Sequence, residues 1–278
     1  MTPDNRDFVR RYGPWAVVTG ASEGIGAAFA AELASRGLNL VLVARREDRL
    51  AALSQELASK YRIEVRVQPT DLANKDSASA LFHHTEDLDV GLLVAAAGFG
   101  TSGPLLQADD RVEADLLEVN CAAVLRQCLH YGRRMAARRR GGMVLLSSVL
   151  AFQGAPFSAN YAASKAYIQA LAEGVSQELK ADGVDVLSVA PGPIASGFAA
   201  RANLHLGQTM TPEVVARVSV AALGKQGTVR PGWLSKLLGW GLSTAPRFLR
   251  VQITGSIMAN MTRHQRSATP QAMQNKPK

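Results

Sequence analysis

Short apolar runs that alternate with longer helix-like segments are the feature that most constrains how this chain folds. Six runs rich in valine and leucine occupy residues 15–20, 38–45, 62–68, 90–98, 142–148 and 184–192. Each run is continuous rather than alternating in polarity, which is typical of strands buried on both faces of a parallel sheet. Segments of helical length and composition, such as 24–36 and 47–60, lie between them. The rhythm predicts an α/β fold with a doubly wound parallel sheet.

The composition agrees with one globular unit. Hydrophobic residues make up 47% of the 278 residues and charged residues 19%, which excludes a largely disordered chain. From about Gly224 the strand–helix rhythm gives way to glycine, proline and tryptophan, and then to a polar end. We therefore expect a single sheet domain over residues 1–230. A basic and aromatic extension follows over residues 231–278, first as a helical cover and then as a mobile polar tail.

The net charge of +8 is concentrated at the C-terminal end. Ten basic residues and no acidic residue follow Glu213, so the rest of the chain holds 21 basic against 23 acidic residues. A basic isoelectric point of this origin does not indicate nucleic-acid binding. No apolar stretch has the length of a signal peptide or a membrane span, and two cysteines cannot form a disulfide framework. A cytoplasmic protein is expected.

A glycine-rich turn joins the first run to the first helical segment. It reads Thr19-Gly20-Ala21-Ser22-Glu23-Gly24-Ile25-Gly26. Glycines at such a turn let the backbone approach a pyrophosphate, which then lies at the helix N-terminus. A plain tight turn would explain one glycine, whereas three at this point favour a nucleotide site.

The variant spacing TGxxxGIG resembles that of the classical short-chain dehydrogenase/reductase family. The resemblance extends over roughly residues 15–230. It includes Tyr161 and Lys165 as the family's YxxxK motif, Ser148 thirteen residues upstream, Asn120 on the preceding helix, and Pro191-Gly192-Pro193-Ile194 after the last run. It implies a Rossmann-like fold and an oxidoreductase that transfers hydride between a nicotinamide and a carbonyl or alcohol carbon.

The residues themselves support this chemistry. Tyr161 and Lys165 stand four apart and share one helix face, where an ammonium lowers the pKa of a phenol toward neutrality. Ser148 can hydrogen-bond a carbonyl oxygen, while Ser147 is expected to point to the other side of the strand. The alternative is a packed aromatic ring beside a lysine whose chain lies along it.

By resemblance, Tyr161 is the proton donor, Lys165 also holds the nicotinamide ribose, and Asn120 supports a water in a proton relay. A packing or capping role for Asn120 remains the alternative. A homodimer or homotetramer is also implied. The residues expected to contact the cofactor are Gly20, Ser22, Glu23, Gly24, Ile25, Gly26, Arg45, Arg46, Asp71, Leu72, Ala97, Gly98, Tyr161, Lys165, Pro191, Gly192, Ile194 and Ser196.

The end of the second run favours NADP(H). Enzymes specific for NAD usually carry an acidic residue there, whereas this chain has Arg45 and Arg46, which suit a 2′-phosphate. Solvated charges at a helix start are the alternative reading. The chain departs from the family at Ala95-Ala96-Ala97-Gly98, where Asn-Asn-Ala-Gly is usual, and this puts the rigidity of that loop in doubt.

The sequence does not identify the substrate. An apolar pocket for it is suggested by Phe152, Phe157, Phe198, Leu204, Leu206 and Met210. The five histidines lack metal-ligand spacing, so no catalytic metal is expected. The arginines of residues 133–140 are expected to form a solvated helix end capped by Gly141. A catalytically silent, nucleotide-binding sensor is the competing function.

The C-terminal extension allows two interpretations. An apolar stripe of Trp233, Leu234, Leu237 and Leu238, with Trp240 nearby, lies among the cations Lys236, Arg247 and Arg250. It predicts either a helix that covers the substrate pocket or a subunit interface, or a peripheral contact with an anionic membrane or an acyl carrier.

Overall fold

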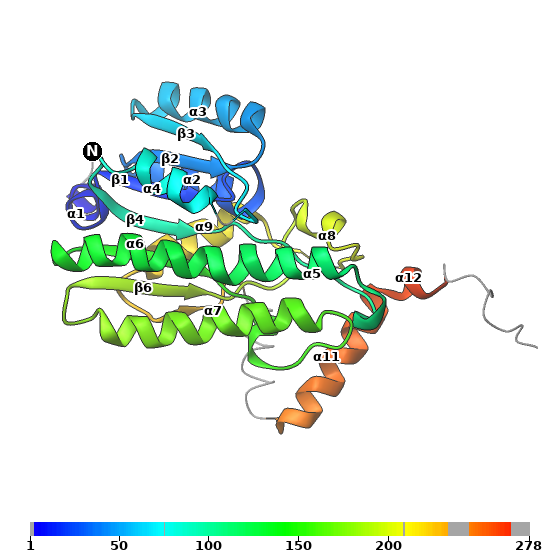
Figure 1. Cartoon of the computed structure of the whole chain (residues 1–278). Helices are drawn as coiled ribbons and strands as arrows, with labels where there is room; N and C mark the ends of the chain where they lie inside the picture. The colour runs from blue at the N-terminus through cyan, green and yellow to red at the C-terminus, as the bar shows by residue number, and fades with distance from the viewer. Residues whose placement is uncertain (1–2, 75, 208, 233–244, 268–278) are drawn as a thin grey trace, which may run out of the picture.

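A seven-stranded parallel sheet forms the centre of the molecule (Figure 1). The computed structural model describes residues 3–74, 76–207, 209–232 and 245–267. The strand order is β3-β2-β1-β4-β5-β6-β7, which is doubly wound about β1 and β4. The strands are β1 (Trp15–Thr19), β2 (Asn39–Ala44), β3 (Val65–Pro69), β4 (Val90–Ala95), β5 (Gly141–Leu146), β6 (Val184–Val189) and β7 (Thr228–Val229). Each of the six predicted runs overlaps a strand to within a few residues, and β7 was not predicted.

Helices cover both faces of this sheet. The main ones are α1 (Pro3–Tyr12), α2 (Gly24–Ser35), α3 (Glu47–Tyr61), α4 (Ser77–His84), α5 (Asp110–Leu117), α6 (Ala123–Ala137), α7 (Ala159–Glu178) and α9 (Pro212–Ala222). Alternate strand residues serve the two layers, because successive side chains of a strand point to opposite faces. Leu40 and Leu42 pack with α2, α3 and α9, while Val41 and Val43 pack with α4, α6 and α7. This double burial explains why the runs of the inner strands are continuously apolar. The expectation fails at β3, which lies at the sheet edge, is only partly buried and carries Arg66 and Gln68.

The remaining helices lie toward the carboxyl ends of the strands, where Figure 1 labels α8 (Phe198–Arg201), α11 (Arg247–Met261) and α12 (Arg263–Ser267) on its right side. The 3₁₀ turns Leu105–Gln107 and Val149–Phe152 accompany them. A π-helical turn, Glu118–Ala122, joins α5 to α6 and contains Asn120. Such turns are rare and are often found at functional sites. This edge is where an open α/β sheet binds its ligands.

The arginines at the end of α6 form the solvated helix end expected from the sequence only in part: Arg133 and Arg139 are exposed, whereas the others are partly buried. Arg134 donates to the carbonyl oxygens of Thr85, Glu86 and Leu88, and Arg138 donates to that of Val90. The helix ends at Ala137, and Gly141 begins β5 instead of capping it. The guanidinium groups therefore hold the loop before β4, because its backbone acceptors need partners.

Most of the stripe predicted for the extension, Trp233, Leu234, Lys236, Leu237, Leu238 and Trp240, lies outside the described residues. Of its cations, Arg247 and Arg250 belong to α11, and Arg250 lines a cavity described below. The described residues lend no support to a contact with membranes or an acyl carrier. None of the helices in the described ranges has both the length and the apolarity needed to cross a bilayer.

Candidate active site

Two adjoining cavities occupy the carboxyl edge of the sheet. One has a volume of about 400 Å³ and lies over the turn between β1 and α2. The other, of about 270 Å³, lies between β5, α7 and α11. Five residues line both cavities: Ile25, Ala96, Gly98, Ser196 and Phe198. The two cavities are therefore neighbours, and ligands bound in them would lie side by side at these shared residues.

The glycine turn shapes the larger cavity. Gly20 has a φ of +69°, and a Cβ placed there would lie 2.8 Å from the backbone nitrogen of Ala97. A Cβ on Gly26 would lie 2.2 Å from the carbonyl oxygen of Gly20. Helix α2 begins at Gly24 without a side-chain cap. Its first N–H groups thus face the turn, where they suit an anionic group.

Arginines surround the same cavity. Arg46 forms an ion pair with Glu23 (2.9 Å) and donates to the Ser22 hydroxyl (3.0 Å). Among the described residues, Arg45 has no hydrogen bond or ion pair. Arg201 of α8 stacks on the Phe99 ring at 3.8 Å, and burial together with the Arg45 cation lowers its pKa. Cations that repel each other around a cavity indicate a site for an anion.

The structure brings the expected cofactor residues to these cavities. The larger one is lined by Gly20, Ser22, Glu23, Gly24, Ile25, Gly26, Arg45, Arg46, Asp71, Leu72, Ala97, Gly98 and Ser196. The smaller one is lined by Tyr161, Lys165, Pro191, Gly192 and Ile194. The sequence reading missed Thr70, Ala73, Phe99, Asp115, Val119 and Arg201. Of these, Arg201 carried a usable signal, since it lies three residues after Phe198, which was expected at the substrate pocket.

The loop after β4 is held in place without the family's two asparagines. The backbone N–H of Ala97 donates to the Thr19 hydroxyl at 3.2 Å. Asn120 accepts from the N–H of Phe99 at 3.1 Å and donates to its carbonyl oxygen at 2.9 Å. Asn120 also donates to Ser164 and is fully buried, so it lines neither cavity. Neighbouring elements thus supply the hydrogen bonds that the alanines lack.

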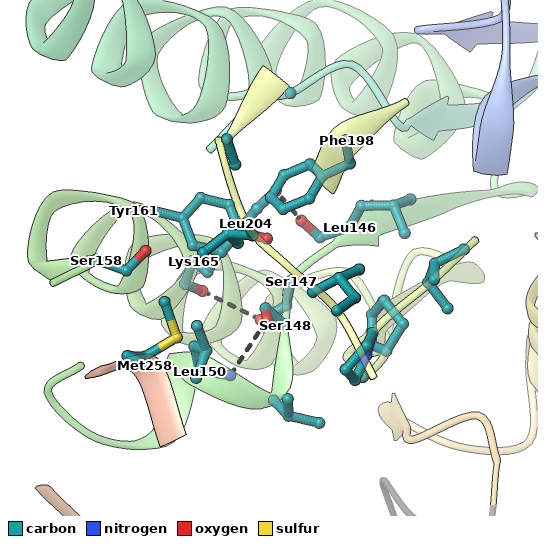
Figure 2. A pocket seen from close by; sticks show the side chains of 18 of the residues that line it. Leu146, Ser147, Ser148, Leu150, Ser158, Tyr161, Lys165, Phe198, Leu204 and Met258 are labelled. Atoms are coloured by element: carbon teal, nitrogen blue, oxygen red, sulfur yellow. Dashed lines mark hydrogen bonds between the residues drawn. The ribbon is translucent and has the colours of Figure 1, made fainter. Parts of the chain in front are cut away.

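Tyr161, Ser148 and Lys165 converge on the smaller cavity (Figure 2). Ser148 follows β5 and accepts from the N–H of Leu150 at 3.2 Å. The Lys165 ammonium donates to the carbonyl oxygen of Leu146 at 2.8 Å and lies 5.7 Å from the centre of the Tyr161 ring. Ser147 donates to the carbonyl oxygen of Lys165 at 3.1 Å, which binds β5 to α7. The three side chains are therefore fixed by the strand and helix that carry them.

Burial controls the electrostatics of this group. It raises the pKa of Tyr161 to about 12, and a hydrogen bond with Ser148 offsets this only in part. The expectation that Lys165 brings the phenol toward neutrality is wrong for this form of the protein. Burial also lowers the pKa of Lys165 to about 8, so its ammonium loses a proton more readily than an exposed lysine does. A tyrosine in this state is a neutral proton donor across the physiological pH range.

The wall of the smaller cavity is largely apolar. Of the six residues suggested from the sequence, Phe152, Phe198, Leu204 and Leu206 line it. Phe157 and Met210 do not, because Met210 packs against the core and its backbone pairs with that of Ile194. Helix α11 of the C-terminal extension supplies a further wall through Arg250, Thr254, Ile257, Met258 and Met261, whereas the predicted helical cover was placed on other residues, the stripe from Trp233 to Trp240. Their spacing is that of one helix face, so the signal was present in the sequence.

Known proteins match the chain over most of its length. Residues 14–206 match the short chain dehydrogenase family. A 7beta-hydroxysteroid dehydrogenase of Clostridium sardiniense is 32% identical over 234 residues, which cover 83% of this chain and 90% of that protein. The inactive hydroxysteroid dehydrogenase-like protein 1 of Homo sapiens is 33% identical over 224 residues, covering 78% and 68%.

A solved structure extends the comparison to three dimensions. It is a short-chain dehydrogenase from Sphingobium yanoikuyae in complex with NADPH, with a TM-score of 0.77 and 25% identity. The match covers 95% of this chain and 99% of the other. With the family match and the curated relatives, it shows that the chain belongs to the short-chain dehydrogenase/reductase family of nicotinamide-dependent oxidoreductases.

Proposed function

We propose that this protein is an NADP(H)-dependent enzyme that interconverts a carbonyl group and an alcohol on a largely apolar substrate. The observation that carries the proposal is the convergence of Tyr161, Ser148 and Lys165 on an apolar cavity that shares a wall with the glycine-lined one. A protein that only senses nucleotide has no need of a buried phenol and a buried ammonium beside a second cavity.

The larger cavity fits a dinucleotide. Its floor is the turn at which a side chain on Gly20 or Gly26 would clash, and its rim carries Arg45, Arg46 and Arg201. The glycines would let a pyrophosphate approach α2, and the arginines would bind a 2′-phosphate. The bound nicotinamide supplies or accepts the hydride. The NADPH complex of the Sphingobium yanoikuyae relative supports this choice of cofactor.

The side chains at the smaller cavity have separate tasks during reduction. Tyr161 donates the proton of its hydroxyl to the substrate's carbonyl oxygen. Ser148 hydrogen-bonds the same oxygen and stabilises the charge that develops on it. The Lys165 ammonium stabilises the tyrosinate that remains. Asn120 is a positioning residue, since it fixes the backbone at Phe99 and the hydroxyl of Ser164.

The test of this function is Tyr161→Phe. The variant keeps the ring in its contact with Phe198 and loses the proton, so NADPH reduction of bulky ketones should fall by about 100-fold or more. NADPH affinity and the thermal unfolding midpoint serve as controls and should stay unchanged. Wild-type protein that binds NADPH but reduces none of a panel of ketones, oxoacyl thioesters and steroid ketones would favour the silent sensor, which the inactive human relative keeps in view.

A further inference from the structure

The smaller cavity contains more positive charge than the proposed chemistry uses. Its described lining includes Lys165, Arg230 and Arg250 and no aspartate or glutamate. Lys165 belongs to the catalytic group, whereas neither arginine has a role in proton or hydride transfer. Cations beside an apolar ligand site are costly to desolvate, so they indicate a ligand with the opposite charge.

Arg230 is the better-placed of the two. It directly follows β7, whose partner β6 leads into Pro191, so it lies at the same sheet edge as Ser148. Its guanidinium carbon lies 4.4 Å from the centre of the Phe152 ring. Among the described residues it has no hydrogen bond or ion pair, and its Nε is buried without a partner. A guanidinium packed over a ring keeps N–H donors that a carboxylate can bind with two parallel hydrogen bonds.

Arg250 lines the same cavity from another element, helix α11. It lies in the first turn of α11, and its Nε donates to the carbonyl oxygen of Ala245 at 2.7 Å. The next residue, Val251, would lie 3.6 Å from a Cβ on Gly154. The start of α11 therefore packs beside the segment that carries Phe152, which is the ring under Arg230. Arg230 and Arg250 thus both line the cavity, from two elements that approach each other around Phe152.

The remainder of the wall is apolar and lies along the same helix. Ile257, Met258 and Met261 follow Arg250 on one face of α11, and Met261 accepts a hydrogen bond from the N–H of His205 at 3.1 Å. The cavity thus has an apolar side toward the end of α11 and a cationic side toward its start. A ligand that matches it has an apolar body and an anionic end.

We propose that the substrate is an apolar carbonyl compound that carries a carboxylate, and that Arg230, with Arg250 beside it, binds this carboxylate. The inference rests on the proposed function for the reaction, but the binding of an apolar carboxylate can be measured without any reaction. Arg230 then acts on the choice of substrate and takes no part in proton transfer.

Calorimetry of non-reacting probes tests the binding directly. Decanoate and decanamide share an apolar chain and differ in charge. Wild-type protein should bind decanoate about 10-fold or more tightly than decanamide, the value of a charge-assisted hydrogen bond, with an advantage that shrinks as salt rises. Arg230→Gln should abolish this preference. Arg217→Gln, an exposed site on α9 that lines neither cavity, should keep it. Equal affinity of the wild type for the two probes overturns the proposal.

Turnover provides the second test. Linear methyl-ketone carboxylic acids of increasing length are compared with their methyl esters as substrates for reduction by NADPH. Arg230→Gln should raise KM for the acids about 10-fold or more, with little change in kcat, and leave the esters unaffected. If the wild-type enzyme has equal KM values for the acid and its methyl ester, the carboxylate site is overturned and the proposed function still stands.

The two proposals fail in different ways. If neither acid nor ester is reduced, the proposed function fails, and the decanoate preference still decides the carboxylate site. If Arg230→Gln does not fold, the wild-type comparison and Arg250→Gln, which should weaken decanoate binding, decide it instead. Arg230→Lys keeps the charge without the planar fork and should restore part of the preference.

Discussion

At the scale of single residues, burial has more influence on the site than the charges read from the sequence. The YxxxK spacing correctly predicts that Tyr161 and Lys165 lie together, but it holds no information on how deeply each is buried. Both are nearly inaccessible to solvent, at 9% and 6% exposure, so each is shifted toward its neutral form. A spacing rule fixes which groups meet, whereas their protonation depends on the surrounding wall, which is assembled from distant segments.

The weakened ammonium of Lys165 gives a pH dependence. Its pKa of about 8 means that the cation is present below that pH and is lost as the pH rises through it. Because the cation stabilises the developing tyrosinate, kcat/KM for carbonyl reduction should fall above pH 8, since this ratio reports the free enzyme. Lys165→Arg, whose guanidinium keeps its proton, should move this decline to higher pH. A decline at the same pH in the variant would assign it to another group.

Cofactor preference can be tested at Arg45 and Arg46. Arg45→Ala or Arg46→Ala removes a charge-assisted bond to the 2′-phosphate, so NADPH affinity should fall ~10- to 150-fold while NADH affinity stays nearly unchanged. Arg49→Ala is the matched control, because Arg49 also pairs with Glu23 but does not line the cavity. Fluorescence titration with both cofactors provides the measurement. Equal losses for NADPH and NADH would mean that the arginines support the fold alone.

At the scale of elements, the sequence predicts the strands and helices that have a local pattern, and it misses those that form only through pairing with distant segments. The buried runs and the glycine turn are local patterns, so β1 to β6 and α2 are foreseen to within a few residues. Strand β7 has two residues, and only its pairing with Ser188 and Val189 makes it a strand. The π turn at Asn120 interrupts a helix of ordinary composition. The cavity face of α11 was visible in the spacing, but nothing local places that face over Ser148.

Two glycine substitutions separate a tight turn from an open helix surface. Gly26→Ala places a Cβ 2.2 Å from the Gly20 carbonyl oxygen, so the turn must shift. We expect NADPH affinity to fall about 10-fold or more, since a distortion of ~1.4 kcal/mol suffices for that. Gly174→Ala in α7 meets nothing within 4 Å and should raise the free energy of unfolding by about 0.5–1 kcal/mol. Titration with NADPH and thermal denaturation provide the measurements, and unchanged NADPH binding in Gly26→Ala would contradict the steric argument.

At the scale of the whole molecule, the outer helical layer retains apolar surface. Val112, Leu117, Leu129 and Tyr167 of α5, α6 and α7 are between 38% and 45% exposed. Figure 1 shows α6 and α7 side by side on one face of the sheet. Apolar side chains gathered on such a face are typical of an interface, and the family resemblance implies a dimer or a tetramer.

Self-association through this layer is testable by analytical ultracentrifugation. Wild-type protein should sediment as a dimer or tetramer, and Leu129→Glu should shift it toward the monomer, because a charge would be buried without a partner. Phe248→Glu on α11 is the control, since Phe248 is exposed outside this layer and should leave association unchanged. A monomeric wild type at micromolar concentration would contradict this assignment.

The placement of α11 also has a consequence for how the protein is made and how it varies. Every described residue that lines the larger cavity precedes Ala202, whereas the smaller cavity acquires one wall from residues 250–261. Synthesis runs from the N-terminus, so the residues of the larger cavity leave the ribosome well before the wall that α11 adds to the smaller one. Changes along the inner face of α11 can alter which molecule is accepted without touching the sheet.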